Sequence, residues 1–235
     1  MKKKLIILTG PTAVGKTDLS IRLARTVGGE IISADSMQVY RRMDIGTAKI
    51  RPEEMDGVRH HLIDILEPTE SFNAFLFKEY ALKAANEIWE RGSIPIIVGG
   101  TGFYIQTLLY DIEFAKSDEN DGIRDELNKL YEEHGAAFLH DMLAKVDPEY
   151  AAEVHENNVK KVIRAIEFYR QTGHKLSEHN TEQRERTSPY NFEYFVLSDD
   201  RTVLYERIDK RIDKMVEAGL IAEVQALLDE GVDRE

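Results

Sequence analysis

The stretch that decides the fold is Leu5-Ile6-Ile7-Leu8-Thr9 and the eight residues after it, Gly10-Pro11-Thr12-Ala13-Val14-Gly15-Lys16-Thr17. The apolar run predicts a short buried strand, and the eight residues match the pattern G-x-x-x-x-G-K-[ST] at every fixed position. Backbone N–H groups of such a loop converge on phosphate oxygens, helped by the positive end of the helix that follows. Lys16 adds a mobile positive charge, and the Thr17 hydroxyl can ligate Mg²⁺. We therefore predict that this loop binds phosphates; a turn with only a structural role is disfavoured, because the motif lies between a strand and a helix.

Strand and helix signals alternate around this motif. Apolar runs predict strands at residues 5–8, 30–33, 94–98 and 191–197. Helical periodicity predicts helices at about residues 16–27, 73–91 and 201–218. Such alternation is typical of a parallel sheet with helices on both faces. The predicted fold class is therefore α/β, with a P-loop NTPase-like parallel sheet as its core.

The pattern changes after about Phe114. From Lys116 to about Ser188 there is no strand candidate, only helical periodicities separated by turn signals at Gly135, Asp147-Pro148 and Thr172-Gly173. We therefore predict an all-helical insertion, residues 115–189, within an α/β core made of residues 1–114 and 190–235.

The composition limits the classes of function. The 235 residues are 42% hydrophobic and 31% charged, which supplies enough apolar material for a buried core and excludes a disordered chain. Acidic residues outnumber basic ones by 43 to 31, and the formal net charge of −12 excludes a protein that coats nucleic acid generally. Any nucleic-acid partner must therefore bind a locally basic surface.

The compartment is indicated by what the chain lacks. It contains no Cys, which excludes disulfides and thiolate metal sites and fits a reducing compartment. The apolar run at residues 5–8 is too short for a signal peptide, and no run approaches the roughly 18 apolar residues of a membrane span. We expect a cytoplasmic protein that does not contact membranes.

A P-loop usually handles ATP or GTP, with a second Mg²⁺ ligand from an Asp at the end of an apolar strand. The run Ile94–Val98 leads instead into Gly99-Gly100, without a carboxylate. Asp64 lies in a broken apolar run, whereas Asp35 follows a predicted strand and lies close to the P-loop in a sheet of this topology. Asp35 can ligate a metal or act as a general base; the alternative is a structural Asx turn or helix cap.

Further motifs carry a resemblance to a known family. The segments Ser33-Ala34-Asp35-Ser36-Met37-Gln38-Val39-Tyr40 and Met43-Asp44-Ile45-Gly46-Thr47-Ala48-Lys49 resemble the bacterial tRNA dimethylallyltransferases, which are P-loop prenyltransferases. The resemblance spans nearly the whole chain in order and continues through Arg59–Asp64, Gly99–Tyr104, Asp147–His155, Arg164–Glu167 and Arg207–Leu220. The P-loop alone is generic, whereas D-S-x-Q-V-Y followed by M-D-I-G-T-A-K is very specific.

The resemblance implies transfer of a dimethylallyl group from dimethylallyl diphosphate to N6 of the adenosine 3′-adjacent to the anticodon in tRNA. The P-loop would bind the diphosphate, and Lys16 with a Thr17-bound Mg²⁺ would stabilise the charge that grows on the departing pyrophosphate. Asp35 would take the proton of the amine. The tRNA would be contacted by the residues of the D-S-x-Q segment, which are Asp35, Ser36, Met37 and Gln38. A Gln amide has the donor and the acceptor needed to read an adenine edge.

Three more residues of the core are implied in the reaction. Thr101 matches the family position beside the acceptor amine; its alternative role is a helix N-cap, and the two roles can coexist. Arg207 and Arg211 lie four residues apart on one helix face, and the resemblance implies that one of them contacts the diphosphate. The alternative for both is a solvated charged face shared with Asp209 and Asp213.

The predicted insertion would supply a basic surface. Residues 155–175 contain five Lys and Arg against two Glu, which gives a local charge of +3. Lys160, Lys161 and Arg164 fall on neighbouring helix positions, and the resemblance implies that this insertion grips the tRNA anticodon stem-loop. The alternative is a charged solvent face. Nothing in the sequence indicates more than a monomer.

The chain also departs from the family pattern. Asn157-Asn158 and Lys161 stand where the family commonly has Asn-Asp and an Arg, and Lys lacks the planar fork for a bidentate contact. Family chains continue beyond the position of Glu235, so we expect a C-terminal part with further helices and a basic segment to be missing here.

The sequence leaves two rival functions open. One is a small-molecule or nucleoside kinase that uses ATP, and the other is a tRNA-binding protein with a degenerate site. The intact Lys16, Thr17 and Asp35 favour an enzyme. His60-His61 is disfavoured as a metal site, because neither Cys nor a spaced carboxylate pair accompanies it.

Overall fold

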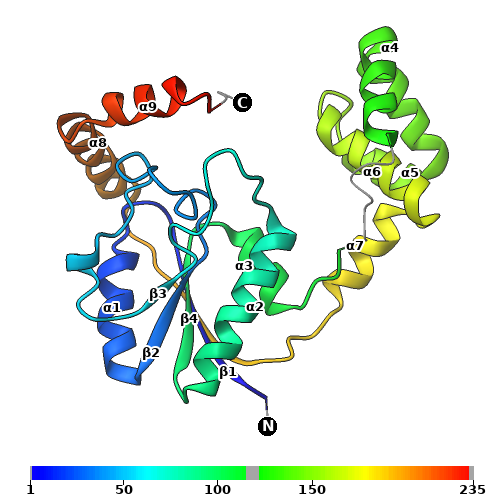
Figure 1. Ribbon diagram of the computed structural model, residues 1–235. Coiled ribbons are helices and arrows are strands. Elements are labelled where there is room, and N and C mark those ends of the chain that lie inside the picture. Colours follow the sequence, from blue (N-terminus) through cyan, green and yellow to red (C-terminus); the bar gives the residue numbers. More distant parts are fainter. Residues whose placement is uncertain (1, 115–121, 233–235) are drawn as a thin grey trace. The chain divides into compact units, whose positions relative to one another are not determined.

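The computed structural model describes residues 2–114 and 122–232. The chain forms two compact units, a core unit of residues 1–111 with 188–235 and a helical unit of residues 112–187 (Figure 1). The predicted insertion starts at residue 115, within the range 115–121 that lies outside the described residues. Its predicted end, residue 189, lies just beyond the last residue of the helical unit, residue 187.

A five-stranded sheet runs through the core unit in the order β3-β2-β4-β1-β5, and every neighbouring pair is parallel. The strands are β1 (Lys4–Thr9), β2 (Gly29–Ser33), β3 (His60–His61), β4 (Ile94–Gly99) and β5 (Asn191–Val196). The predicted α/β fold with a parallel sheet is confirmed. The sequence does not predict β3, because this strand consists of only two polar residues and strands are predicted from apolar runs.

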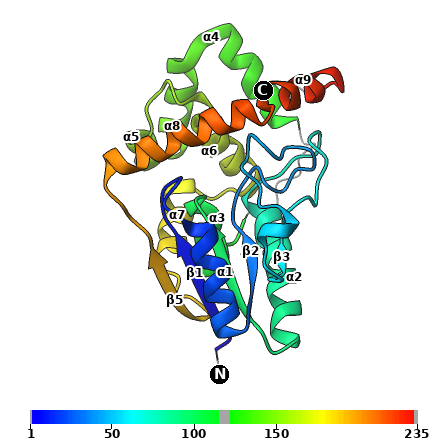
Figure 2. The same ribbon diagram turned by 90° about the vertical axis from the view of Figure 1, so that its left-hand side faces the viewer.

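The helices α1 (Lys16–Val27) and α2 (Ala74–Glu90) cover opposite faces of this sheet (Figures 1 and 2). The strand order gives the physical reason. The chain moves from β1 outward to β2 through α1, and it then returns inward to β4 through α2. Because such crossovers are right-handed, reversing the direction of travel places the second helix on the other face. A short helix, α3 (Gly102–Leu109), packs against α2.

Apolar side chains from the strands and from both helices form the core of this unit. Ile31 and Ile96, which are partners in the β2–β4 register, pack with Ile21 and Ala24 of α1. A fully buried side chain of this size contributes roughly 1.5–3 kcal/mol of transfer free energy. On α2 the buried positions recur at helical spacing and include Phe77, Ala81, Ala84, Ala85 and Ile88.

Two helices follow β5 at the end of the chain, α8 (Arg201–Glu217) and α9 (Leu220–Asp229). The first confirms the predicted helix. Helix α9 is not predicted from the sequence, because its apolar residues do not form a single buried face. Large apolar side chains remain exposed on both helices, namely Tyr205, Ile212, Val216, Ile221 and Val224. Within residues 2–114 and 122–232, every helix is too short or too polar to cross a membrane.

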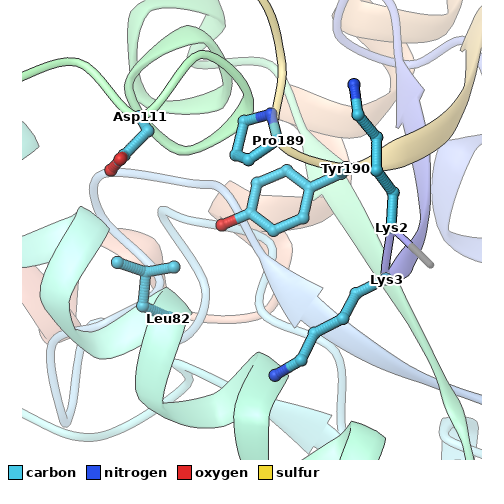
Figure 3. Close-up of a pocket in the computed structure, with 6 residues that line it drawn as sticks. All are labelled: Lys2, Lys3, Leu82, Asp111, Pro189 and Tyr190. Atoms are coloured by element: carbon cyan, nitrogen blue, oxygen red, sulfur yellow. The ribbon is translucent and has the colours of Figure 1, made fainter.

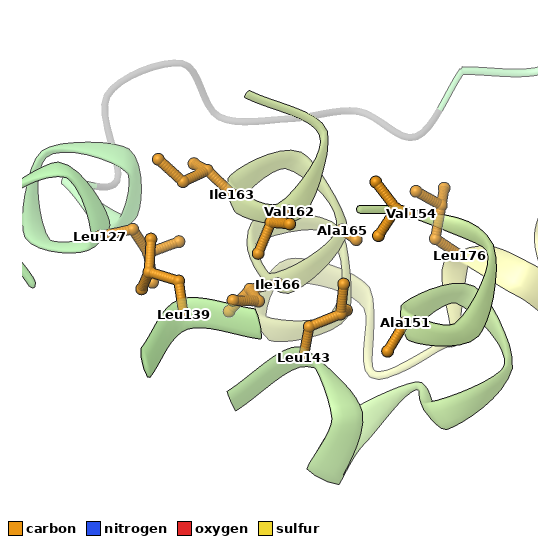
Figure 4. Packing of buried hydrophobic residues seen from close by; sticks show 10 residues of the cluster. All are labelled: Leu127, Leu139, Leu143, Ala151, Val154, Val162, Ile163, Ala165, Ile166 and Leu176. Atoms are coloured by element: carbon orange, nitrogen blue, oxygen red, sulfur yellow. The ribbon is translucent and has the colours of Figure 1, made fainter. Parts of the chain in front are cut away.

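In its described residues the helical unit contains helices and no strand. These helices are α4 (Ile123–Val146), α5 (Pro148–Glu153), α6 (Val159–Thr172) and α7 (Leu176–Arg184). The predicted turn signals lie where the helices break, with left-handed φ values of 82° at Gly135 inside α4 and 73° at Gly173 after α6. The unit has its own hydrophobic core (Figure 4), formed by Leu127, Leu139, Leu143, Ala151, Val154, Val162, Ile163, Ala165, Ile166 and Leu176.

Asp147 is a buried carboxylate that joins two of these helices. It accepts hydrogen bonds from the Tyr150 N–H (3.1 Å) at the start of α5 and from the Ser177 N–H (2.9 Å) and hydroxyl (2.7 Å) of α7. Burial alone would raise the pKa of Asp147, but these hydrogen bonds outweigh it and lower the pKa below its ordinary value. The ionised side chain therefore fixes α7 against the start of α5.

Candidate active site

The P-loop lies between β1 and α1, as the strand–loop–helix prediction requires. Gly10 has a φ of 151°, and a Cβ there would lie 2.5 Å from the carbonyl oxygen of Leu197, so a side chain does not fit. Ala13 and Gly15 are both left-handed, with φ values of 63° and 93°, and Gly15 is the N-cap of α1. The loop thus wraps around the N-terminus of α1, whose first-turn N–H groups have no partner within the helix. This is an arrangement that binds anions.

Lys16 is held at this loop by its own backbone. Its Nζ donates hydrogen bonds to the carbonyl oxygens of Gly10 (2.9 Å) and Pro11 (2.8 Å). Burial lowers the pKa of Lys16; the negative charge of Asp35 opposes this effect, and the positive charge of Arg211 adds to it. Three of the residues singled out in the sequence therefore lie within electrostatic reach of one another.

Asp35 lies two residues after the end of β2, at the same edge of the sheet as the P-loop. Its Oδ1 accepts hydrogen bonds from the backbone N–H groups of Met37 (2.9 Å) and Gln38 (3.3 Å). This is the Asx turn that the sequence leaves open as an alternative. Both hydrogen bonds described for the carboxylate are accepted by Oδ1. The turn therefore fixes the side chain through Oδ1, and Oδ2 can take a proton.

Gln38 is already engaged within the protein. Its Oε1 accepts a hydrogen bond from the Ser33 hydroxyl (3.3 Å), and its Nε2 donates to the carbonyl oxygens of Thr47 (3.2 Å) and Ala48 (3.5 Å). Ser36 beside it is half-buried and Met37 is exposed. In this conformation the Gln38 amide, which the sequence predicts to read an adenine edge, thus holds the turn formed by residues 44–49.

Thr101 lies next to Asp35 because β2 and β4 end side by side. Its backbone N–H donates to the carbonyl oxygen of Ala34 at 3.3 Å. The approach is close enough that a Cβ on Gly99 would lie 2.2 Å from the same oxygen. Thr101 is the N-cap residue of α3, but its side chain makes no capping hydrogen bond. Its hydroxyl is therefore not used by the helix.

Both candidate arginines of α8 lie at the P-loop. Arg207 Nη1 lies 3.4 Å from the carbonyl oxygen of Ala13 and 2.9 Å from Asp199 Oδ2. Arg211 contributes to the lowered pKa of Lys16, which places its charge near the same loop. Among the described ion pairs Arg207 binds Asp199, and neither arginine binds Asp209 or Asp213.

The comparisons with known proteins now identify the family. Residues 38–235 match the family model described as IPP transferase. The chain belongs to the IPP transferase family. It is 58% identical over 230 residues to a tRNA dimethylallyltransferase of Lachnoclostridium phytofermentans, covering 98% of this chain and 74% of that relative.

Two solved structures are also similar to this IPP transferase. One is the full-length tRNA isopentenylpyrophosphate transferase from Bacillus halodurans, at 47% identity and a TM-score of 0.69, covering 99% of this chain and 72% of that chain. The other is a eukaryotic dimethylallyltransferase described as acting on tRNA, at 36% identity and a TM-score of 0.87, covering 97% of this chain and 56% of that chain.

Asp64, the other candidate Mg²⁺ ligand in the IPP transferase, is bound by a lysine. Lys49 Nζ donates to Asp64 Oδ1, to Asp44 Oδ1 and to the carbonyl oxygen of Tyr40, each at 2.6 Å. The Lys49 side chain is only 4% exposed. The sequence gives no sign of this role, because Asp64 comes from a different segment than Tyr40 and Asp44.

The remaining metal candidates are also accounted for. His61 Nε2 lies 2.8 Å from Glu30 Oε2, and His60 Nδ1 lies 2.9 Å from the carbonyl oxygen of Val58. Across the described residues no three His, Cys, Asp or Glu side chains gather at one point. The Thr17 hydroxyl, in the first turn of α1, is exposed and makes none of the described hydrogen bonds.

The basic residues of the helical unit are placed on a surface. Lys160, Lys161 and Arg164 are all exposed on α6, whose buried side consists of Val162, Ile163, Ala165, Ile166 and Glu167. The structure thus confirms that the three share a solvent-facing helix surface, which is what both the RNA-binding reading and the solvated-face alternative require.

A hollow of the core unit lies in another part of the chain. It has a volume of about 690 Å³ and is lined by Lys2, Lys3, Leu82, Asp111, Pro189 and Tyr190 (Figure 3). Burial, with the charge of Asp111, raises the pKa of Tyr190 to about 12, so its hydroxyl stays protonated at neutral pH. None of the candidate site residues lines this hollow.

Proposed function

We propose that the protein is a Mg²⁺-dependent tRNA prenyltransferase. It transfers a dimethylallyl group from dimethylallyl diphosphate to N6 of the adenosine 3′-adjacent to the anticodon and releases diphosphate. The observation that supports this best is the meeting of the P-loop, Lys16, Arg211 and Asp35 at one edge of the sheet. An anion cradle beside a general base suits an alkyl transfer with an anionic leaving group. Membership of the IPP transferase family favours it over an ATP-dependent kinase.

The chemistry divides between two halves of the site. In the donor, the bond between the allylic carbon and the diphosphate oxygen breaks, and its electron pair leaves with pyrophosphate. In the acceptor, the N6 lone pair forms the new carbon–nitrogen bond, and Asp35 takes the proton that the amine loses. Because an exocyclic adenine amine is a weak nucleophile, the carboxylate helps most as positive charge builds on nitrogen.

The leaving group would be bound by the P-loop backbone, by Lys16 and by the arginines of α8. Lys16 exchanges its hydrogen bonds with the Gly10 and Pro11 carbonyls for phosphate oxygens when the donor binds. The exposed Thr17 hydroxyl would hold a Mg²⁺ ion, since Mg²⁺ sites commonly use few protein ligands. A bound Mg²⁺ would add charge stabilisation on pyrophosphate.

The acceptor side would be formed by Asp35, Ser36, Met37, Gln38 and Thr101, and the base must leave its stack to reach it. To read an adenine edge, Gln38 would exchange its contacts with the 44–49 turn for the base. The exposed Lys160, Lys161 and Arg164 would contact the backbone of the anticodon stem-loop. The proposal includes a monomer in the cytoplasm, where tRNA is modified.

A labelled donor tests the proposal directly. We would incubate the protein with radiolabelled dimethylallyl diphosphate, unmodified tRNA and Mg²⁺, and with ATP as a competing donor. Label in the RNA with ATP inert is the expected result. ATP consumption without prenylation would support the kinase, and RNA binding without either reaction would support a degenerate binding protein.

Two variants separate the roles of the base and the cradle. Asp35→Asn keeps an Oδ1 that can hold the Asx turn but cannot take a proton, so turnover should be lost while donor binding stays within about twofold. Lys16→Ala should weaken donor binding as well. Near-normal turnover of Asp35→Asn would remove Asp35 from the chemistry, and unchanged donor affinity of Lys16→Ala would remove Lys16 from the phosphate site.

A further inference from the structure

A carboxylate far along the chain reaches back to the segment that carries the candidate base. Glu223 of α9 accepts hydrogen bonds from three consecutive backbone N–H groups, those of Asp44 (2.8 Å), Ile45 (2.7 Å) and Gly46 (2.9 Å). Hydrogen bonds to an ionised acceptor are roughly twice as strong as neutral ones, so this is a firm attachment. Neither the phosphate site nor the proposed transfer step uses Glu223.

The three N–H groups belong to a compact turn with two polar ends. Within it the Lys49 N–H donates to the Asp44 carbonyl (2.9 Å), and the Ala48 N–H donates to the Ile45 carbonyl (3.0 Å). Its N–H end faces Glu223. Its carbonyl end, at Thr47 and Ala48, faces Gln38.

A continuous set of hydrogen bonds therefore runs from Glu223 to the candidate base. Glu223 holds the N–H end of the turn, and the carbonyl end holds the Gln38 side chain. The Gln38 backbone N–H in turn donates to Asp35 Oδ1 at 3.3 Å. The P-loop is not part of this set, so the acceptor half of the site has a support that the donor half does not share.

We propose that Glu223 is a positioning residue: its carboxylate fixes the 44–49 turn and, through Gln38, the orientation of Asp35 on the acceptor side of the site. This inference rests on the proposed function for its kinetic readout, but its structural content is independent of it. Loss of the Glu223 charge loosens the turn and slows proton removal from the acceptor, and it leaves diphosphate binding intact.

Glu223→Gln is the test variant, because it keeps the length of the side chain and loses the charge and one acceptor oxygen. We expect kcat with tRNA to fall at least tenfold, while the Kd for dimethylallyl diphosphate stays within twofold of wild type. Hydrogen exchange followed by mass spectrometry should show faster exchange of the amides of residues 44–46 and 37–38. If this variant does not fold, Glu223→Asp keeps the charge and is shorter by one methylene, and it should show the same pattern with a smaller change.

Glu230→Gln is the matched control. Glu230 is the C-cap residue of the same helix and ion-pairs with Arg42. The same chemical change there removes a contact between the end of α9 and Arg42, and it leaves the 44–49 turn untouched. It should leave kcat and the exchange rates near wild type. The inference is overturned if Glu223→Gln has unchanged kcat and exchange, if it weakens donor binding as much as turnover, or if Glu230→Gln acts alike. An inactive wild type would refute the proposed function, and the exchange experiment would still decide the role of Glu223.

Discussion

Replacing Gly99 with Ala should disrupt the edge of the sheet that carries the candidate base. Gly99 ends β4 beside Ala34, and an added Cβ would lie 2.2 Å from the Ala34 carbonyl oxygen and 2.5 Å from its carbonyl carbon. Real Cβ contacts stay beyond 3.0 Å, so the two strand ends must separate by about 0.8 Å. Overpacking of this kind costs about 1–3 kcal/mol. Because Ala34 precedes Asp35, a displacement near 1 Å should also slow the reaction by about 100-fold.

The single tryptophan makes the stability measurement specific to the core unit. Trp89 lies on α2 and stacks on Tyr190 with ring centroids 5.7 Å apart, so its fluorescence in urea follows unfolding of this unit. Gly99→Ala should lower the free energy of unfolding by about 2 kcal/mol. Gly100→Ala is the control: its Cβ would meet only the Gly10 carbonyl oxygen at 3.9 Å, and its stability should change by less than about 0.5 kcal/mol. An unchanged unfolding midpoint for Gly99→Ala would refute the packing argument.

Three further perturbations follow from the described contacts. Burial lowers the pKa of Lys16 and a diphosphate favours its charged form, so donor affinity should fall as the pH rises through that lowered pKa. Calorimetry should detect proton uptake at alkaline pH that Lys16→Arg abolishes, and its persistence in that variant would exclude Lys16. The folded-state pKa of Asp147 lies below its ordinary value of 3.8, so its contribution to stability is present above about pH 4 and is lost as the pH falls through the folded value. Denaturation curves between about pH 6 and 3 should show a smaller acid-induced loss for Asp147→Asn, and an equal loss would contradict the assignment. Lys49→Met should destabilise the core unit by roughly 1–2 kcal/mol, since its carboxylate partners are half-exposed and regain water; an unchanged urea midpoint would count against this.

Local patterns were enough to predict most of the sheet and the cradle. Apolar runs marked four of the five strands, and the G-x-x-x-x-G-K-[ST] motif fixed the loop between β1 and α1. The position of Asp35 beside that loop followed from the order of strands in a parallel sheet. The first two inferences use residues that are neighbours in the chain, and the third uses a general rule for parallel sheets.

What escaped prediction depends on contacts between distant residues. Glu223 and Asp44 are 179 residues apart, and no periodicity connects them. Lys49 belongs to the M-D-I-G-T-A-K motif, yet its buried position depends on Asp64 from another loop. The Gln38 side chain has the chemistry to read a base, but in the folded protein the turn at residues 44–49 occupies it.

The pairing of β1 with β5 has a consequence for the order in which the protein forms on the ribosome. Lys4 pairs with Asn191, so β1 leaves the exit tunnel long before its partner is synthesised. The helical unit is contiguous in sequence and built from short-range contacts, which form quickly. It can fold around its own core while the edge of β1 that pairs with β5 still lacks its hydrogen-bond partners. Slowed translation just before residue 191 would prolong the exposure of that edge, and a nascent chain halted there should depend most on a chaperone.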